Sequence, residues 1–167
     1  QVATTAQATK GAVYHHFSSK EELYLALLHA DLEEKKQLFQ KSVDMPGTCR
    51  KRLRRLTSDY FHLPRGHREI ISLVRRDVNV FEGDARSSLI RAYQSALPEQ
   101  VEKILRDGVE AKEIEAADPR LLSWSFVALV EVSLSPHAGR VFPGAEAKLD
   151  HILNLFFDGA VSTAVPS

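Results

Sequence analysis

Apolar side chains recur at intervals of three and four residues along almost the whole chain, and this spacing predicts helices. No stretch alternates apolar and polar residues with the period of two that marks a strand, while glycine and proline fall between the periodic segments. The pattern therefore indicates an all-α protein. The predicted helices cover residues 10–17, 19–43, 49–61, 67–82, 85–112, 119–134 and 145–164.

Local signals set the expected ends of these helices. Ser19 is followed three residues later by Glu22, which is the spacing of a capping box. Pro98 should kink or split the helix that contains it, and residues 135–143, with two prolines and a glycine, are expected to form a loop. Residues 1–7 resemble the end of a helix whose beginning is missing. The side chains expected to cap helices are Thr9, Ser19, Thr48, Asp84 and Asp118.

The composition is that of a folded protein rather than a disordered or membrane-spanning one. The 167 residues suffice for one domain, or for a small module and a larger one, and 44% are hydrophobic and 26% charged. No apolar run approaches the length that spans a bilayer and no signal peptide opens the chain, so we expect a cytoplasmic protein. The single Cys49 rules out an internal disulfide and offers no zinc-type cysteine pair.

The net charge of zero hides an uneven distribution along the chain. Residues 41–76 carry ten Lys or Arg against three acids, whereas residues 77–118 carry five basic and ten acidic residues. The basic segment could draw one end of the protein toward DNA. The alternative is that it forms an ordinary solvated face.

The short helix predicted near the N-terminus carries more chemistry than core. Val13 and Phe17 are four residues apart and can face inward together, which leaves Lys10, Tyr14 and His15 on the outer faces. Such groups can meet phosphates and base edges. A metal site is the alternative use of the histidines, but neighbouring residues on a helix point about 100° apart, so both cannot easily bind one ion.

Residues 2–23 contain a restrictive motif. Its centre is the spacing Lys10-Gly11-x-x-Tyr14-x-x-Phe17-x-x-Lys20, preceded by Val2-Ala3 and Ala6. In this spacing the segment resembles the helix-turn-helix of the TetR family of bacterial transcriptional repressors. The resemblance implies an all-α fold with an N-terminal helix-turn-helix head, whose first helix is missing here, and a larger helical domain for ligand binding and dimerisation. The implied division is residues 1–24 for the rest of the head and 25–167 for the larger domain, with 19–43 as the linking helix.

The resemblance also implies which residues meet DNA. The second helix of a helix-turn-helix lies in the major groove, with its N-terminal residues near base edges. Lys10 and Lys20 suit phosphates, Tyr14 offers a hydroxyl to a phosphate, and His15 can reach a base or the backbone. The full set of expected DNA contacts is Thr4, Thr5, Thr9, Lys10, Gly11, Ala12, Tyr14, His15, His16 and Lys20.

Two further sets of residues are candidates for binding in the body. The last two predicted helices are apolar on more than one side, which favours self-association. The expected dimer contacts are Leu122, Phe126, Leu129, Leu149, Ile152, Leu153, Phe156 and Phe157. The residues considered for a ligand pocket, although aromatic residues at helical spacing are usually core, are Tyr60, Asn79, Tyr93, Trp124 and Ser125.

The sequence thus predicts a ligand-responsive transcriptional regulator. We expect a homodimeric repressor that a small, apolar molecule releases from a palindromic operator, with no cofactor or metal. No phosphate-binding loop, nucleophile elbow or metal helix motif is present, so no enzymatic activity is expected. The alternative is a dimeric helical protein that binds a small molecule or a partner and has no DNA function.

Overall fold

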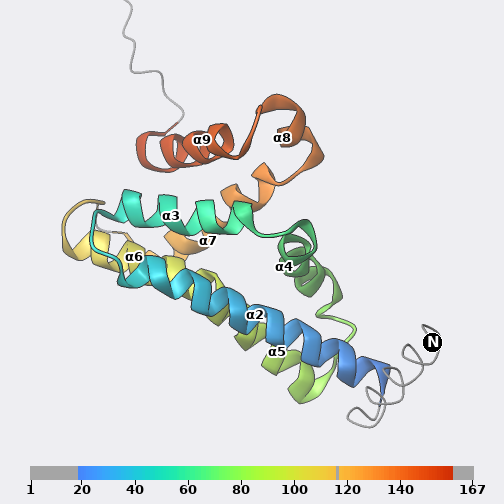
Figure 1. The fold of residues 1–167 in the computed structure, drawn as a ribbon. Coiled ribbons are helices and arrows are strands. Elements are labelled where there is room, and N and C mark those ends of the chain that lie inside the picture. The colour runs from blue at the N-terminus through green and yellow to red at the C-terminus, as the bar shows by residue number, and fades with distance from the viewer. Residues whose placement is uncertain (1–18, 116, 160–167) are drawn as a thin grey trace, which may run out of the picture.

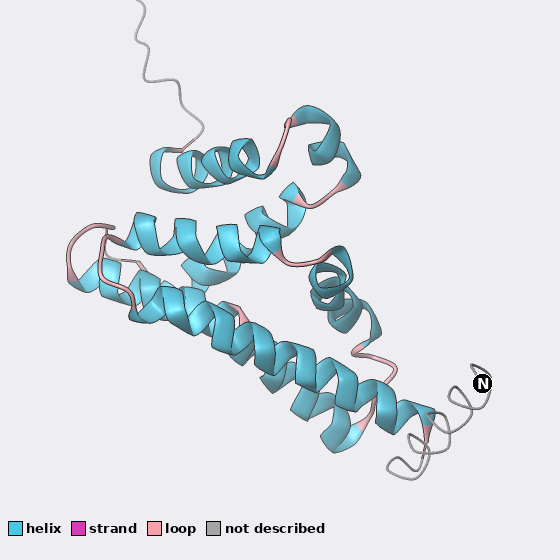
Figure 2. Ribbon diagram, in the orientation of Figure 1, coloured by secondary structure: helices cyan, strands magenta, loops and turns pink. Residues whose placement is uncertain are grey.

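The computed structural model describes residues 19–115 and 117–159, and within these ranges every regular element is a helix (Figures 1 and 2). The predicted all-α fold is confirmed. None of the described helices is long and apolar enough to cross a membrane. The helices are α2 (Lys20–Asp44), α3 (Cys49–His62), α4 (Arg65–Asp77), α5 (Gly83–Ala96), α6 (Pro98–Glu110), α7 (Pro119–Ser133), α8 (Pro136–Val141) and α9 (Ala145–Asp158).

The long helix α2 runs the length of the body and takes part in two apolar cores. In Figure 1 it lies along α5 and α6, with α3 above it and α9 on the far side of α3. Its C-terminal half places Phe39 in the main core, which is built with α3, α6, α7 and α9. Its N-terminal half places Leu28 and Leu32 in a smaller core with α4 and α5. Because α2 belongs to both cores, it connects the two ends of the body.

The predicted caps of three helices are present. The Ser19 hydroxyl accepts a hydrogen bond from the Glu22 amide at 3.0 Å and begins α2. Thr48 caps α3 in the same way, and the Asp118 carboxylate accepts from the Leu121 amide at 2.7 Å to begin α7. These side chains satisfy amides that have no partner within the helix.

Pro98 splits the predicted helix of residues 85–112, as the sequence indicated. Proline cannot donate the backbone hydrogen bond that would continue α5, and it instead takes the first position of α6. The predicted cap at Asp84 is wrong, because Gly83 turns the chain with a φ of 53° and α5 already begins there.

Two expectations near the C-terminus are also wrong. Residues 135–143 are not simply a loop, because the Ser135 hydroxyl accepts from the Ala138 amide at 3.2 Å and starts the short helix α8. Pro136 at the first helical position favours that helix rather than breaking it. The last helix ends at Asp158 instead of residue 164, because Gly159 adopts a φ of 77° that L side chains rarely adopt.

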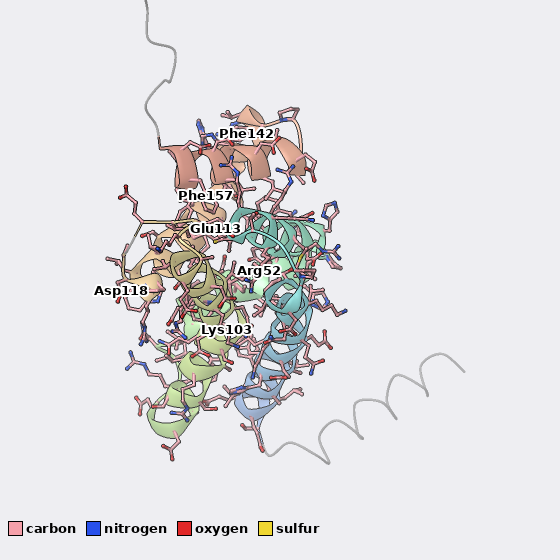
Figure 3. The ribbon with its side chains drawn as sticks, turned by 90° about the vertical axis from the view of Figure 1, so that its left-hand side faces the viewer. Arg52, Lys103, Glu113, Asp118, Phe142 and Phe157 are labelled. Atoms are coloured by element: carbon pink, nitrogen blue, oxygen red, sulfur yellow. The ribbon has the colours of Figure 1, made fainter. Side chains whose placement is uncertain are left out.

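Arg52 fastens the C-terminal end of α2 to the rest of the body. Its side chain lies near the middle of the molecule in Figure 3 and is 8% exposed. Its guanidinium donates to the carbonyls of Ser42 and Val43 at the end of α2, and to the Asp107 carboxylate on α6 at 2.8 Å. The Arg52 guanidinium thus provides donors for two backbone carbonyls at the end of α2, and it joins α3 to both α2 and α6.

Candidate functional site

Most of the residues expected to touch DNA lie outside the described ranges. These are Thr4, Thr5, Thr9, Lys10, Gly11, Ala12, Tyr14, His15 and His16. Lys20 is described, and it is the first residue of α2 and exposed to solvent. What the structure describes is the capped start of α2, which directly follows residues 1–18 along the chain.

Two polar contacts hold the N-terminal half of α2 to its neighbours. The Tyr24 hydroxyl donates to the Asp77 carboxylate, at the end of α4, at 3.0 Å. His29 lies 3.2 Å from the Ser88 hydroxyl on α5. Tyr24 also stacks on Phe81, with 6.1 Å between ring centroids. The N-terminal half of α2 thus contacts the end of α4, the α4–α5 connection and α5.

A buried charged cluster makes another connection between α2 and α4. The Lys35 ammonium, which is 2% exposed, donates to the Asp31 carboxylate one turn earlier on α2. The second oxygen of Asp31 lies 2.6 Å from Nδ1 of His67 on α4. Burial lowers the pKa of Lys35 to about 8, because desolvation disfavours the ammonium. The cluster is costly to disrupt, because removing one partner leaves a buried charge without compensation.

The residues considered for a ligand pocket are only partly brought together. Tyr93 and Trp124 line one hollow of about 280 Å³ between α4, α5 and α7. Arg75 and Glu131 form an ion pair at its wall. Trp124 is 51% exposed, so it lies at the rim.

Three of the five pocket candidates are placed elsewhere. Tyr60 is buried in the main core, where its hydroxyl donates to the Arg68 carbonyl at 3.2 Å and burial raises its pKa. Asn79 is exposed and accepts from Arg86. Ser125 is exposed and donates to a carbonyl of its own helix. Helical spacing could not separate these positions from those that line the hollow.

A larger cleft was not foreseen from the sequence. It has a volume of about 650 Å³ and lies between the α3–α4 corner and the α7–α9 end of the body. Arg65, Arg68 and Glu69 come from α4, whereas Lys148 comes from α9. These residues are far apart along the chain, so no local pattern could have indicated that they share a surface.

The apolar side chains expected at a dimer interface divide into two groups. Phe126, Leu149, Ile152 and Leu153 are at most 1% exposed and belong to the main core of the protomer. A core and an interface produce the same apolar spacing, so the sequence could not separate these two roles. Leu122, Leu129, Phe156 and Phe157 are only partly buried.

One open apolar surface lies on α7, α8 and α9. Val132 is 69% exposed and Val141 is 56% exposed. With Leu129 and Leu155 they line a groove of about 360 Å³. Figure 3 shows Phe142, which also borders this groove, at the α8–α9 end of the molecule.

The basic segment at residues 41–76 is largely neutralised. Arg50 pairs with Asp158 on α9 at 3.1 Å, and Arg54 contacts both Glu146 and Asp150 on the same helix. These charges join α3 to α9 instead of forming a free basic face toward DNA. Among the described residues, no group of three His, Cys, Asp or Glu side chains could hold a metal ion.

Comparisons with known proteins agree with this architecture. The family model for bacterial regulatory proteins of the tetR family matches residues 1–27, and the tetracyclin repressor-like C-terminal domain matches residues 46–134. A helix-turn-helix segment that leads into a helical body of this kind defines a ligand-responsive, DNA-binding transcriptional regulator. The chain belongs to the tetR family of bacterial regulatory proteins. Proteins of this family are generally non-enzymatic.

Solved structures share the fold at low sequence identity. A Clostridium perfringens protein named as a candidate fatty acid metabolism regulator is 22% identical, with a TM-score of 0.78 over 97% of this chain and 88% of its own. The regulator PfmR from Thermus thermophilus is 20% identical, with a TM-score of 0.71 over 97% of this chain and 90% of its own. AibR, solved with isovaleryl coenzyme A and operator DNA, is 20% identical, with a TM-score of 0.61 over 89% of this chain and 80% of its own. A search of the curated proteins finds no significant match.

Proposed function

We propose that the chain is one protomer of a homodimeric repressor that acts in the cytoplasm and leaves a palindromic operator when a small molecule binds. Family membership supports the DNA and ligand partners. AibR, which shares the fold, was solved with both an acyl coenzyme A and operator DNA. We further propose that the protein catalyses no reaction and that its output is a change in DNA occupancy.

The observation that carries the proposal is the attachment of α4 to α2. The Asp31–His67 contact and the Tyr24–Asp77 hydrogen bond join these helices at two points on α4. Lys20, at the start of α2, belongs to the motif and lies within residues 1–27, which match the family's N-terminal model. A ligand that shifts α4 therefore shifts the base of the DNA-binding segment. It can do so only to the extent that it binds the shifted arrangement more tightly.

In the proposed complex, the DNA contacts are the residues that the motif indicates, from Thr4 to Lys20. Two copies of the short helix that carries Lys10 and Tyr14 would enter successive major grooves, which lie about 34–36 Å apart on one face of the duplex. The dimer fixes this spacing. We place its interface on the open groove of Leu129, Val132, Val141 and Leu155 instead of on the buried core residues.

The hollow at Tyr93 and Trp124 is the proposed place for part of the ligand. Its wall includes Arg75 of α4, so an occupant would press on the helix that is attached to α2. Its volume of about 280 Å³ is at the small end for a ligand site.

The experiment begins with selection of a binding site from a pool of random DNA duplexes. Affinity for the selected duplex is then measured by mobility shift at several salt concentrations, with the wild-type protein and with Tyr14→Ala and Lys20→Ala. Each phosphate contact adds close to one unit to the salt slope, so Lys20→Ala should lower the slope by about one. Lys41→Ala is the matched control, because Lys41 is also exposed on α2 but lies in its last turn.

Weaker binding by both test variants, with Lys41→Ala unchanged, would support the proposed contacts. Absence of any sequence-selective binding by the wild-type protein would contradict the proposed function. Equal affinities for all variants would contradict the residue assignment.

A further inference from the structure

The residues that line the cleft between α4 and α9 carry an excess of positive charge, with three cations and one carboxylate. Arg65 and Glu69 neutralise each other, with 2.6 Å between the guanidinium and the carboxylate. Arg68 donates to the backbone carbonyl of Phe61 and pairs with no carboxylate among the described residues. Lys148, which is partly buried, likewise forms no ion pair with any described residue. Two uncompensated cations therefore face one cleft.

This excess of positive charge is not found in the Tyr93–Trp124 hollow. There the Arg75 guanidinium already pairs with Glu131. On α3, Arg50 and Arg54 are likewise paired, since they contact acids of α9. Within the cleft, Arg68 and Lys148 are the cations that pair with no carboxylate among the described residues.

Apart from Ser72 and Ser135, the rest of the cleft wall is formed by apolar residues and glycines. Phe61, Leu134 and Phe142 line it, and Phe142 is seen at the α8–α9 end in Figure 3. At about 650 Å³ the cleft has the size of a small-molecule site. Apolar walls with a few convergent polar groups are the usual composition of such sites, in which the polar groups fix the orientation of the ligand.

We propose that this cleft binds an amphiphilic organic anion, with a carboxylate or phosphate group between Arg68 and Lys148 and an alkyl portion against the apolar wall. The inference names the chemical class of the effector and so rests on the proposed function. The position also suits regulation, because Arg68 neighbours His67, which contacts Asp31 on α2. A ligand drawn to Arg68 acts on the part of α4 that is attached to the long helix.

Isothermal titration calorimetry of the full chain tests the proposal with three probes that share one alkyl chain, octanoate, octyl phosphate and octan-1-ol. At least one of the two anions should bind at least about tenfold more tightly than the neutral alcohol, because a charge-assisted hydrogen bond adds that much. The anion that binds more tightly identifies the head group. Lys148→Met should reduce anion affinity about tenfold and leave the alcohol unaffected.

The controls separate a lost contact from a damaged fold. Lys41→Met makes the same change at an exposed lysine outside the cleft and should bind the anions like the wild type. Arg68→Met tests the second cation, with circular dichroism to verify that each variant is folded. Equal binding of anion and alcohol would overturn the proposal. So would unchanged anion affinity in Lys148→Met, or an equal loss in Lys41→Met.

Calorimetry and DNA selection together distinguish a failure of this inference from a failure of the proposed function. Calorimetry is done without DNA, and DNA selection is done without ligand. If the wild-type protein selects a DNA site but the anions bind no more tightly than octan-1-ol, only the ligand class is wrong. If it selects no DNA site, the proposed function fails whatever the titration shows.

Discussion

A single exposed valine offers the sharpest test of the proposed dimer. Val132 on α7 is 69% exposed in the protomer and lines the open groove. Because so little of it is buried, replacing it by glutamate should leave the protomer fold intact. Val80, which is 70% exposed in the turn after α4, allows the same substitution outside the groove.

The expected effect of Val132→Glu follows from burial at a twofold interface. Complete burial of a valine side chain contributes about 1.5 kcal/mol to the free energy of association. Because each valine is already partly buried in the protomer, replacing both copies removes about 2 kcal/mol of this contribution. Burying two carboxylates without partners adds at least about 2 kcal/mol more. A total of about 4 kcal/mol weakens dimerisation roughly a thousandfold.

Sedimentation equilibrium of the wild type, Val132→Glu and Val80→Glu measures these dissociation constants directly. We expect the Val132 variant to be a folded monomer at micromolar concentration and the Val80 variant to dimerise like the wild type. Affinity for the selected palindromic site should fall in parallel, because one protomer occupies only one half-site. A Val132→Glu protein that dimerises as tightly as the wild type would refute the assignment of this face, as would equal weakening in Val80→Glu.

Three further predictions concern the stability of the body. Gly108→Ala should lower the free energy of unfolding in urea by about 1–2 kcal/mol, because its new Cβ would lie 2.8 Å from Cys49 Cβ and overpacking outweighs the gain in helix propensity; no loss would show that α3 and α6 separate easily. Asp118→Ala should cost about 1 kcal/mol, or about 2–4 °C in melting temperature, through loss of the hydrogen bond from Leu121, while Asp118→Asn should be nearly neutral. Burial lowers the pKa of Lys35 from 10.5 to about 8, so between pH 8 and 10.5 the unfolded state binds more protons than the folded state. The contribution of Lys35 to the free energy of unfolding should therefore rise with pH above about 8. Urea titrations at pH 7.5 and 9.5 should show this rise in the wild type and a smaller one in Lys35→Met; an equal rise in both would exclude Lys35 as its source.

The helices and several of their ends were predictable because they depend on neighbouring residues. Ser19, Thr48 and Asp118 cap their helices through contacts only three residues away, and Pro98 acts on its own backbone. The short helix α8 was missed because proline was interpreted as a breaker there, although after Ser135 it starts a helix.

The sites were less predictable because they depend on contacts between distant segments. An apolar stripe has the same spacing whether it meets its own protomer or a partner, so Phe126 and Leu153 could not be distinguished from Leu129. The cleft brings Arg68 together with Lys148, and only the fold reveals that neither has a carboxylate partner among the described residues.

The length of α2 determines how small a ligand-induced change needs to be. Its 25 residues extend about 37 Å, and its last carbonyls are held by Arg52. A tilt of about 5° about that fixed end would carry the opposite end about 3 Å sideways, by the geometry of a straight rod of this length. In a symmetric pair, opposite tilts would change the separation by about 6 Å, against about 34 Å for one turn of DNA. The protein therefore needs no large internal rearrangement. A shift smaller than one bond length at each turn of α2 adds up along the helix. At the far end it would alter the separation of the two DNA-binding segments enough to weaken their fit to the operator.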